Sequence, residues 1–191
     1  MARSRTREGV KRARRAVSEI PVSDLAGGKE HSLKGQIAKA ARCAREQHKI
    51  VIFTVPAIRK RGGTAPLERT VRGPKVVFCC SASTSMWGLI RGLIRLFNIS
   101  RGSGRSSLSG HELFELLGPR LGESDALLIV ESADRLTDRA LELLRDFYDS
   151  YHASILLVGD KSLLGRIDRR LERLASRAVR WPVAGDANVV G

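Results

Sequence analysis

The sequence is poor in aromatic residues, in cysteine and in long apolar runs. Phe, Trp and Tyr make up 5% of its 191 residues, too few for the usual single-strand nucleic-acid binder that stacks bases on aromatic rings. The three cysteines have no metal-ligand spacing, and nothing about them indicates an oxidising compartment. The most apolar segment, 86–99, is interrupted by Arg91 and Arg95 and is too short to span a bilayer. These absences predict a soluble, cytoplasmic protein.

Positive charge is abundant and unevenly distributed. Lys and Arg number 34 against 20 Asp and Glu, a formal net charge of +14, while a hydrophobic fraction of 42% excludes a wholly disordered polycation. Residues 1–61 hold 16 basic and 5 acidic residues, so most of the excess lies in the first third. Clustered basic residues predict a polyanionic partner. We expect an N-terminal basic arm at 1–31, a core at 32–184 and a short tail at 185–191.

The core alternates segments of helical and strand character. Apolar spacing predicts helices over residues 32–48, 67–71, 85–97, 111–121, 137–151 and 162–177. Short, continuously apolar runs predict strands at 50–55, 75–80, 126–130, 154–158 and 179–184. This alternation predicts a three-layer α/β domain with a five-stranded parallel sheet covered by helices on both faces.

Three local features give sharper expectations. Thr137 is a plausible N-cap for the helix that follows it, with Asp138 placed near the positive end of the helix dipole. In the helix at 85–97, Trp87 shares the apolar spacing and is expected to point inward. Cys79 and Cys80 end an apolar strand, where buried free thiols are the natural interpretation.

The carboxyl ends of the strands are the places to look for a ligand site, because open parallel sheets bind ligands there. Residues 55–64, after the first strand, contain a basic cluster and two glycines but do not match G-x-x-x-x-G-K-[ST]. The third strand ends on Glu131, and the fourth ends on Gly159-Asp160, which places a polar side chain beside that carboxylate. A carboxylate in this position is typical of the strand that holds Mg²⁺ in P-loop nucleotidases.

In this order the segments resemble the AAA+ ATPases that assist DNA transposition, of the MuB/TnsC/TniB type. The run 127–136, Leu-Leu-Ile-Val-Glu-Ser-Ala-Asp-Arg-Leu, is similar to the family's Walker B strand with D-E-A-x-x-L. Residues 143–146 and 156–160 resemble the next helix and the sensor strand, and 174–177 resembles the Ser-Arg before the last strand. The resemblance implies a P-loop NTPase-like AAA+ core that uses ATP and Mg²⁺ and forms a homo-oligomer on double-stranded DNA.

The resemblance also implies roles for individual residues. Glu131 would hold Mg²⁺, Asp160 would act as the sensor, and Arg177 would be the arginine finger presented to a neighbour's nucleotide. Asp134 is a substitute candidate for the catalytic base. The Walker A position corresponds to residues 55–64, so that the nucleotide contacts would be Lys60, Arg61, Gly62, Gly63 and Thr64.

The departures from the family pattern lie mostly at the positions that bind the nucleotide and catalyse its hydrolysis. Glu131 replaces the usual Asp, and Ser132 occupies the position of the catalytic Glu, where a hydroxyl cannot act as a general base for water. Ile58 and Lys60 stand where the Walker A loop needs glycines. One hypothesis is that residues 56–66 reflect a locally shifted reading frame, which the other frames of the coding DNA would reveal. Because the sequence ends at Gly191, we do not expect the small helical lid that follows the fifth strand in the family.

Two groups of basic residues are candidates for binding DNA phosphates. The spacing of Gly88, Arg91, Gly92 and Arg95 puts them on one side of a helix, where small residues would allow a close approach to a backbone. Arg101 and Arg105 follow in the adjoining Gly- and Ser-rich loop. The arm is the stronger candidate for sequence-independent binding, through the residues Arg3, Arg5, Arg7, Lys11, Arg12, Arg14 and Arg15.

Three interpretations of function follow. The first is a DNA-binding accessory protein whose ATP hydrolysis is impaired or lost. The second is an active DNA-dependent ATPase, a regulator of transposition target selection, that uses Arg61 and Glu131 with a base such as Asp134. The third is a remnant subunit that assembles with an intact AAA+ homologue and contributes only Arg177 in trans. A transposase is a possible partner in each case.

Overall fold

A computed structural model describes residues 33–55, 67–80, 83–99, 109–122 and 125–181. These residues form a five-stranded sheet in the order β2-β3-β4-β1-β5, with every neighbouring pair parallel. The strands are β1 (Ile50–Thr54), β2 (Lys75–Cys79), β3 (Leu127–Glu131), β4 (Ile155–Gly159) and β5 (Ala178–Trp181). The predicted α/β fold class, with a five-stranded parallel sheet, is confirmed.

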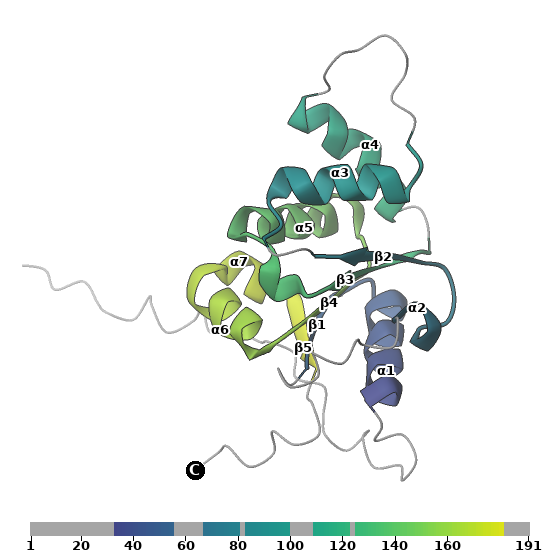
Figure 1. The fold of residues 1–191 in the computed structure, drawn as a ribbon, viewed down its shortest axis with the longest axis vertical. Coiled ribbons are helices and arrows are strands. Elements are labelled where there is room, and N and C mark those ends of the chain that lie inside the picture. Colours follow the sequence, from purple (N-terminus) through teal and green to yellow (C-terminus); the bar gives the residue numbers. More distant parts are fainter. Residues whose placement is uncertain (1–32, 56–66, 81–82, 100–108, 123–124, 182–191) are drawn as a thin grey trace, which may run out of the picture.

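Helices cover both faces of the sheet and complete the three layers (Figure 1). They are α1 (Leu33–Glu46), α2 (Leu67–Thr70), α3 (Met86–Leu96), α4 (Gly110–Gly122), the 3-10 helix η3 (Ala133–Arg135), α5 (Asp138–Tyr151), α6 (Lys161–Arg170) and α7 (Glu172–Ala175). One core cluster joins α1 and α2 to one face of the sheet, and a second joins α3, α5, α6 and α7 to the other. Helix α4 packs on α5 and α3, outside the second layer.

The central strands explain why continuous apolar runs predicted this architecture. Every residue of β1 and of β4 is buried, because these strands lie inside the sheet and have helices above and below. Phe53 points into the α1 layer, whereas Phe147 of α5 belongs to the opposite core cluster and stacks on Phe114 of α4 with ring centroids 4.6 Å apart. The predicted N-cap is confirmed, since the Thr137 hydroxyl accepts a hydrogen bond from the Ala140 amide at 3.3 Å.

Three predictions about local structure are wrong. Trp87 is 42% exposed, because Leu89, Ile90, Leu93 and Ile94 supply the buried face of α3 and Trp87 lies at the edge of that face. The predicted helix at 162–177 is two helices, α6 and α7, which meet at Leu171. Cys79 is exposed because β2 is the edge strand of the sheet, whereas Cys80 is buried as expected.

The boundaries predicted for the arm and the tail, 1–31 and 185–191, lie outside the described residues and stay predictions.

Candidate nucleotide site at the carboxyl edge of the sheet

The strand order brings the predicted catalytic edge together. Strand β4 lies between β1 and β3, so that Thr54 is opposite Gly159, and Glu131 is opposite Val158. On its other side, Glu131 is opposite Cys79 of β2. The polar residues after β3 and β4 therefore occupy one edge, next to the end of β1, as the strand-end argument predicted.

The Glu131 carboxylate is held by two groups of this chain. The Cys79 thiol donates to Oε2 at 2.7 Å, and the Leu67 amide at the start of α2 donates to Oε1 at a longer 3.4 Å. Glu131 is partly buried, so these bonds replace water that the carboxylate would otherwise have. The side chain predicted to hold Mg²⁺ thus links β3 to the edge strand and to α2.

A sharp turn follows Glu131 and redirects the chain across the end of β4. Ser132 has φ 55° and ψ 42°, a left-handed conformation that non-glycine residues seldom adopt. The turn carries Asp134 to β4, where its Oδ1 accepts a hydrogen bond from the Asp160 amide at 3.3 Å. Gly159 permits this approach, because a Cβ there would lie 3.1 Å from the Asp134 amide nitrogen.

Asp160, the predicted sensor, has a structural task in this conformation. It is the N-cap of α6, and its Oδ1 accepts a hydrogen bond from the Ser162 amide at 2.9 Å and another from the Ser162 hydroxyl. These bonds satisfy helix N-terminal donors that would otherwise lack a partner. A role as sensor stays a prediction.

Arg177, the predicted arginine finger, lies in the turn between α7 and β5 and is paired within its own chain. Its Nε is 3.1 Å from Asp149 Oδ1 at the end of α5, and its Nη1 donates to the Ser176 hydroxyl at 2.8 Å. The Arg177 side chain is 43% exposed, and an ion pair this accessible to water contributes little stability. The ion pair with Asp149 therefore orients the Arg177 guanidinium but holds it only weakly.

The predicted nucleotide loop cannot be placed against this edge. Lys60, Arg61, Gly62, Gly63 and Thr64 lie outside the described residues.

Most of the predicted DNA-binding residues are likewise not described. The structure gives no account of Arg101 or Arg105, nor of the arm residues Arg3, Arg5, Arg7, Lys11, Arg12, Arg14 and Arg15.

Helix α3 exposes its two predicted DNA-binding arginines but not its second glycine. Arg91 and Arg95 are both exposed. The expectation that Gly92 shares their open side is wrong, because a Cβ at Gly92 would lie 2.1 Å from the ring of Phe78 in β2. This glycine lets α3 pack closely on the sheet. Gly88, with only ordinary contacts around its Cβ position, remains on the exposed side.

Two features at the end of β3 bear on Mg²⁺-dependent ATP hydrolysis. Both Glu131 oxygens accept hydrogen bonds, and Ser132 supplies no carboxylate beside it. Mg²⁺ in nucleotide sites is bound by one or two carboxylates together with the phosphates. No group of three or more His, Cys, Asp or Glu side chains that could hold a metal ion occurs in the described ranges.

The contact between Cys79 and Glu131 is the part of the site that sequence reasoning missed. Both residues end apolar strands, but their neighbourhood depends on β2 pairing with β3 in the register that sets positions 79 and 131 side by side. The sequence offers only two apolar runs, 75–80 and 126–130, and such runs do not reveal which strands are neighbours.

The three thiols are expected to differ sharply in reactivity, because the thiolate is the reactive form. Burial raises the pKa of Cys80 to about 12 and also raises the pKa of Cys43, whereas Cys79 is exposed. We expect one accessible thiol, that of Cys79, to react per native chain in a colorimetric assay with an aromatic disulfide, and none to react in Cys79→Ser. Reaction of either remaining thiol in folded Cys79→Ser would contradict the burial of Cys43 and Cys80.

The architecture and this edge together define the class of protein, an α/β domain of the P-loop NTPase type. A family model described as an AAA domain matches residues 33–167, most of the chain. The chain therefore belongs to the AAA domain family, which implies nucleotide binding, usually with Mg²⁺. No curated protein matches the sequence.

Solved structures of other proteins share the fold. Cdc6p from Pyrobaculum aerophilum is similar with a TM-score of 0.53 and 16% identity, over 85% of this chain and 49% of that chain. The Aeropyrum pernix ORC1 protein, solved in complex with DNA, is similar with a TM-score of 0.53 and 14% identity, over 78% and 44%. The chain thus spans about half the length of these proteins or less, and identities this low establish the fold alone.

Among the helices that the structure describes, none combines the length and the apolar character needed to cross a membrane.

Proposed function

We propose that this chain is a DNA-binding accessory protein of the AAA family, of the type that assists DNA transposition, whose ATP hydrolysis is impaired or lost. The observation that carries the proposal is the end of β3. Ser132 stands beside Glu131 where hydrolysis needs a general base, and its hydroxyl cannot take up that role. The Glu131 carboxylate is engaged by the Cys79 thiol and the Leu67 amide.

Binding of double-stranded DNA is supported by charge and by fold. The net charge of +14 is concentrated in the first third of the chain, and counterion release from DNA favours such clusters whatever the base sequence. A protein of the same fold was solved in complex with DNA. Phosphate contacts without reading of base edges are expected, so that affinity depends on salt rather than on sequence. Assembly as a homo-oligomer on DNA is part of this proposal.

Measurements of nucleotide turnover and binding test the loss of hydrolysis. We expect no phosphate release from ATP and Mg²⁺ above background, with or without duplex DNA, and no change in Glu131→Ala. Calorimetric titration of ATP with Mg²⁺, in the presence and absence of duplex, reports whether a nucleotide still binds. ATPase activity that disappears in Glu131→Ala would refute the loss of hydrolysis.

An active DNA-dependent ATPase is the second candidate, and one observation favours it. The Asp134 carboxylate reaches the end of β4, where its Oδ1 accepts a hydrogen bond from the Asp160 amide. A carboxylate is thus present at the catalytic edge although position 132 lacks one. In this case turnover is present in the native chain and falls at least about a hundredfold in Asp134→Asn, the usual contribution of a general base.

A remnant subunit that acts through Arg177 in trans is the third candidate. To reach a neighbour's nucleotide, Arg177 would give up its exposed ion pair with Asp149, which costs little free energy. Co-purification with an intact AAA+ homologue, and loss of that homologue's turnover in Arg177→Ala, would support this role.

A further inference from the structure

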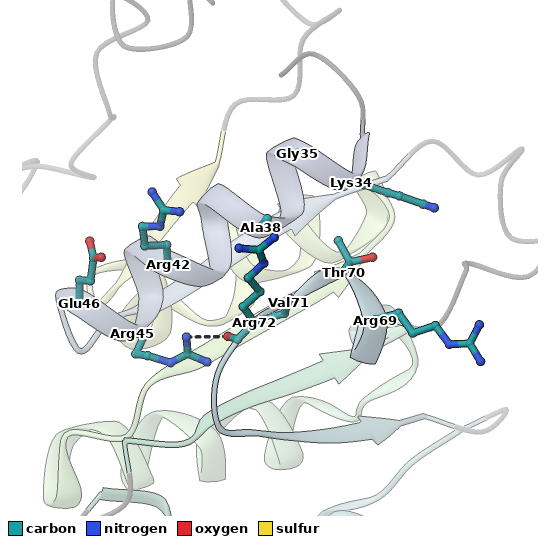
Figure 2. Close-up of a pocket in the computed structure, with 10 residues that line it drawn as sticks. All are labelled: Lys34, Gly35, Ala38, Arg42, Arg45, Glu46, Arg69, Thr70, Val71 and Arg72. Carbon is teal, nitrogen blue, oxygen red and sulfur yellow. Dashed lines mark hydrogen bonds between the residues drawn. The ribbon is translucent and has the colours of Figure 1, made fainter. Parts of the chain in front are cut away.

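A strongly basic groove lies between α1 and α2, on the face of the sheet that also carries the first core cluster (Figure 2). Its volume is about 700 Å³. Among the described residues, the ionisable ones that line it are Lys34, Arg42, Arg45, Arg69, Arg72 and the acid Glu46. We call it the α1–α2 groove. Among the described lining residues, five cations stand against one anion, so the groove is a positively charged surface.

Helical spacing aligns the cations of α1 along the groove. Lys34, Ala38 and Arg42 are each four residues apart and share one side of the helix, while Ile37 and Ala41 fill the core side. At 1.5 Å per residue, Lys34 and Arg42 are about 12 Å apart along the helix axis. Phosphates follow one another every 3.4 Å or so along the axis of one DNA strand, so this separation spans several of them.

The opposite wall is held in place by Arg45. Its guanidinium donates to the carbonyl oxygens of Arg72 at 2.9 Å and of Pro74 at 2.8 Å. Between them Gly73 has φ +84°, and a Cβ there would lie 2.9 Å from Arg45 Nη1, so the turn closes tightly on the guanidinium. Arg45 is therefore a positioning residue, which fixes the backbone that carries the Arg72 side chain.

The Lys and Arg side chains are distributed along the length of the groove. Figure 2 shows the guanidinium of Arg72 extending to Ala38 in the middle of α1, with Lys34 and Arg69 toward one end and Arg42 toward the other. The small side chain of Ala38 leaves room for Arg72 there. Guanidinium groups bind phosphate oxygens through paired N–H donors, which suits Arg42, Arg69 and Arg72 to a phosphodiester backbone.

From this arrangement we infer that the α1–α2 groove binds the phosphate backbone of double-stranded DNA, an inference that rests on the proposed DNA-binding function. None of the described residues that line the groove is aromatic, so they offer no ring on which a base could stack, and the ligand is the backbone rather than a nucleobase.

The test measures the affinity of the full chain for a random-sequence duplex of about three helical turns, by fluorescence anisotropy over a range of salt concentrations. The double variant Arg69→Gln/Arg72→Gln removes two groove charges but keeps the Arg72 carbonyl that Arg45 binds. Its matched control, Arg139→Gln/Arg173→Gln, removes two exposed charges from α5 and α7 on the other side of the sheet. Thermal unfolding of each variant checks that the fold is kept.

We expect the groove variant to bind about tenfold more weakly at low salt, with the slope of log K against log salt reduced by about 2, and the control to match the native chain. Equal binding by the two double variants, when the native chain binds DNA, would overturn the groove and leave the proposed function intact. Failure of the native chain to bind duplex at any salt concentration would overturn both.

Discussion

Neutralising the N-terminal arm is expected to reduce the affinity for duplex DNA by about a thousandfold at low salt, because seven cations would each release counterions from a phosphate. The variant replaces with Gln the residues Arg3, Arg5, Arg7, Lys11, Arg12, Arg14 and Arg15. The slope of log K against log salt should fall by about 6, at roughly 0.9 for each phosphate that the arm no longer neutralises. Anisotropy titrations between about 50 and 200 mM salt, a range in which such slopes are well resolved, measure both quantities.

A shuffled arm is the sharper control for this experiment. Rearranging residues 1–15 without changing their composition keeps the charge and alters only its order. A sequence-independent phosphate binder should retain its affinity and its salt slope after shuffling. If shuffling weakens binding as strongly as neutralisation does, the arm recognises DNA through a defined conformation, and simple charge attraction is the wrong account.

Replacing Gly92 with alanine is expected to lower the free energy of unfolding by about 1–3 kcal/mol, because the added methyl group overpacks the core. The Cβ would lie 2.1 Å from Phe78, whose ring is buried under α3 and can move only by displacing its neighbours. Chemical denaturation of the two chains measures the difference.

Gly88→Ala, on the same helix, is the matched control. Its Cβ would meet only ordinary contacts, at 3.5 Å from the Thr84 side chain and 3.6 Å from the Ser85 hydroxyl. Alanine in a helix is favoured over glycine by about 0.5–1 kcal/mol, so Gly88→Ala should be neutral or stabilising. Should Gly92→Ala prove as stable as Gly88→Ala, the close packing of α3 on β2 would be wrong.

The two predictions separate the folding role of α3 from its binding role. Arg91 and Arg95 are exposed, and their guanidiniums remain candidates for phosphate contacts. Gly92, one residue further on than Arg91, faces the sheet instead. A helix that exposes arginines on one side must pack on the other, and the glycine lets α3 lie close to the edge strand β2.

The fold was predictable because the residues of each strand indicate by themselves whether that strand is buried on both faces of the sheet. Five apolar runs of strand length, separated by helical spacing, require a parallel sheet covered on both faces, whatever the strand order. Thr137 also acts locally, through a hydrogen bond to an amide three residues ahead. The prediction that Trp87 points inward failed for a related reason. Its apolar character can be read from the sequence, but its exposure depends on which side of α3 meets the sheet.

For the candidate site, the sequence predicted only which edge of the sheet holds it. The strand-end rule placed Glu131, Asp134 and Asp160 on one edge without knowledge of strand order. Their hydrogen bonds needed the order β2-β3-β4-β1-β5, since this order sets Cys79 beside Glu131 and lets Asp134 reach the end of β4. Those contacts join residues 26 and 52 positions apart.

The sequence by itself therefore determined an α/β core, a cluster of basic residues that precedes it, and a strand-end carboxylate followed by a serine. These follow from composition and short-range periodicity, which act over a few residues. Only the tertiary structure decided that the Cys79 thiol bonds to Glu131, that Gly92 serves packing, and that Arg45 and Arg72 build one wall of a basic groove. Each of these depends on the packing of distant segments, whose energies are summed over the whole core and leave no local signature in the chain.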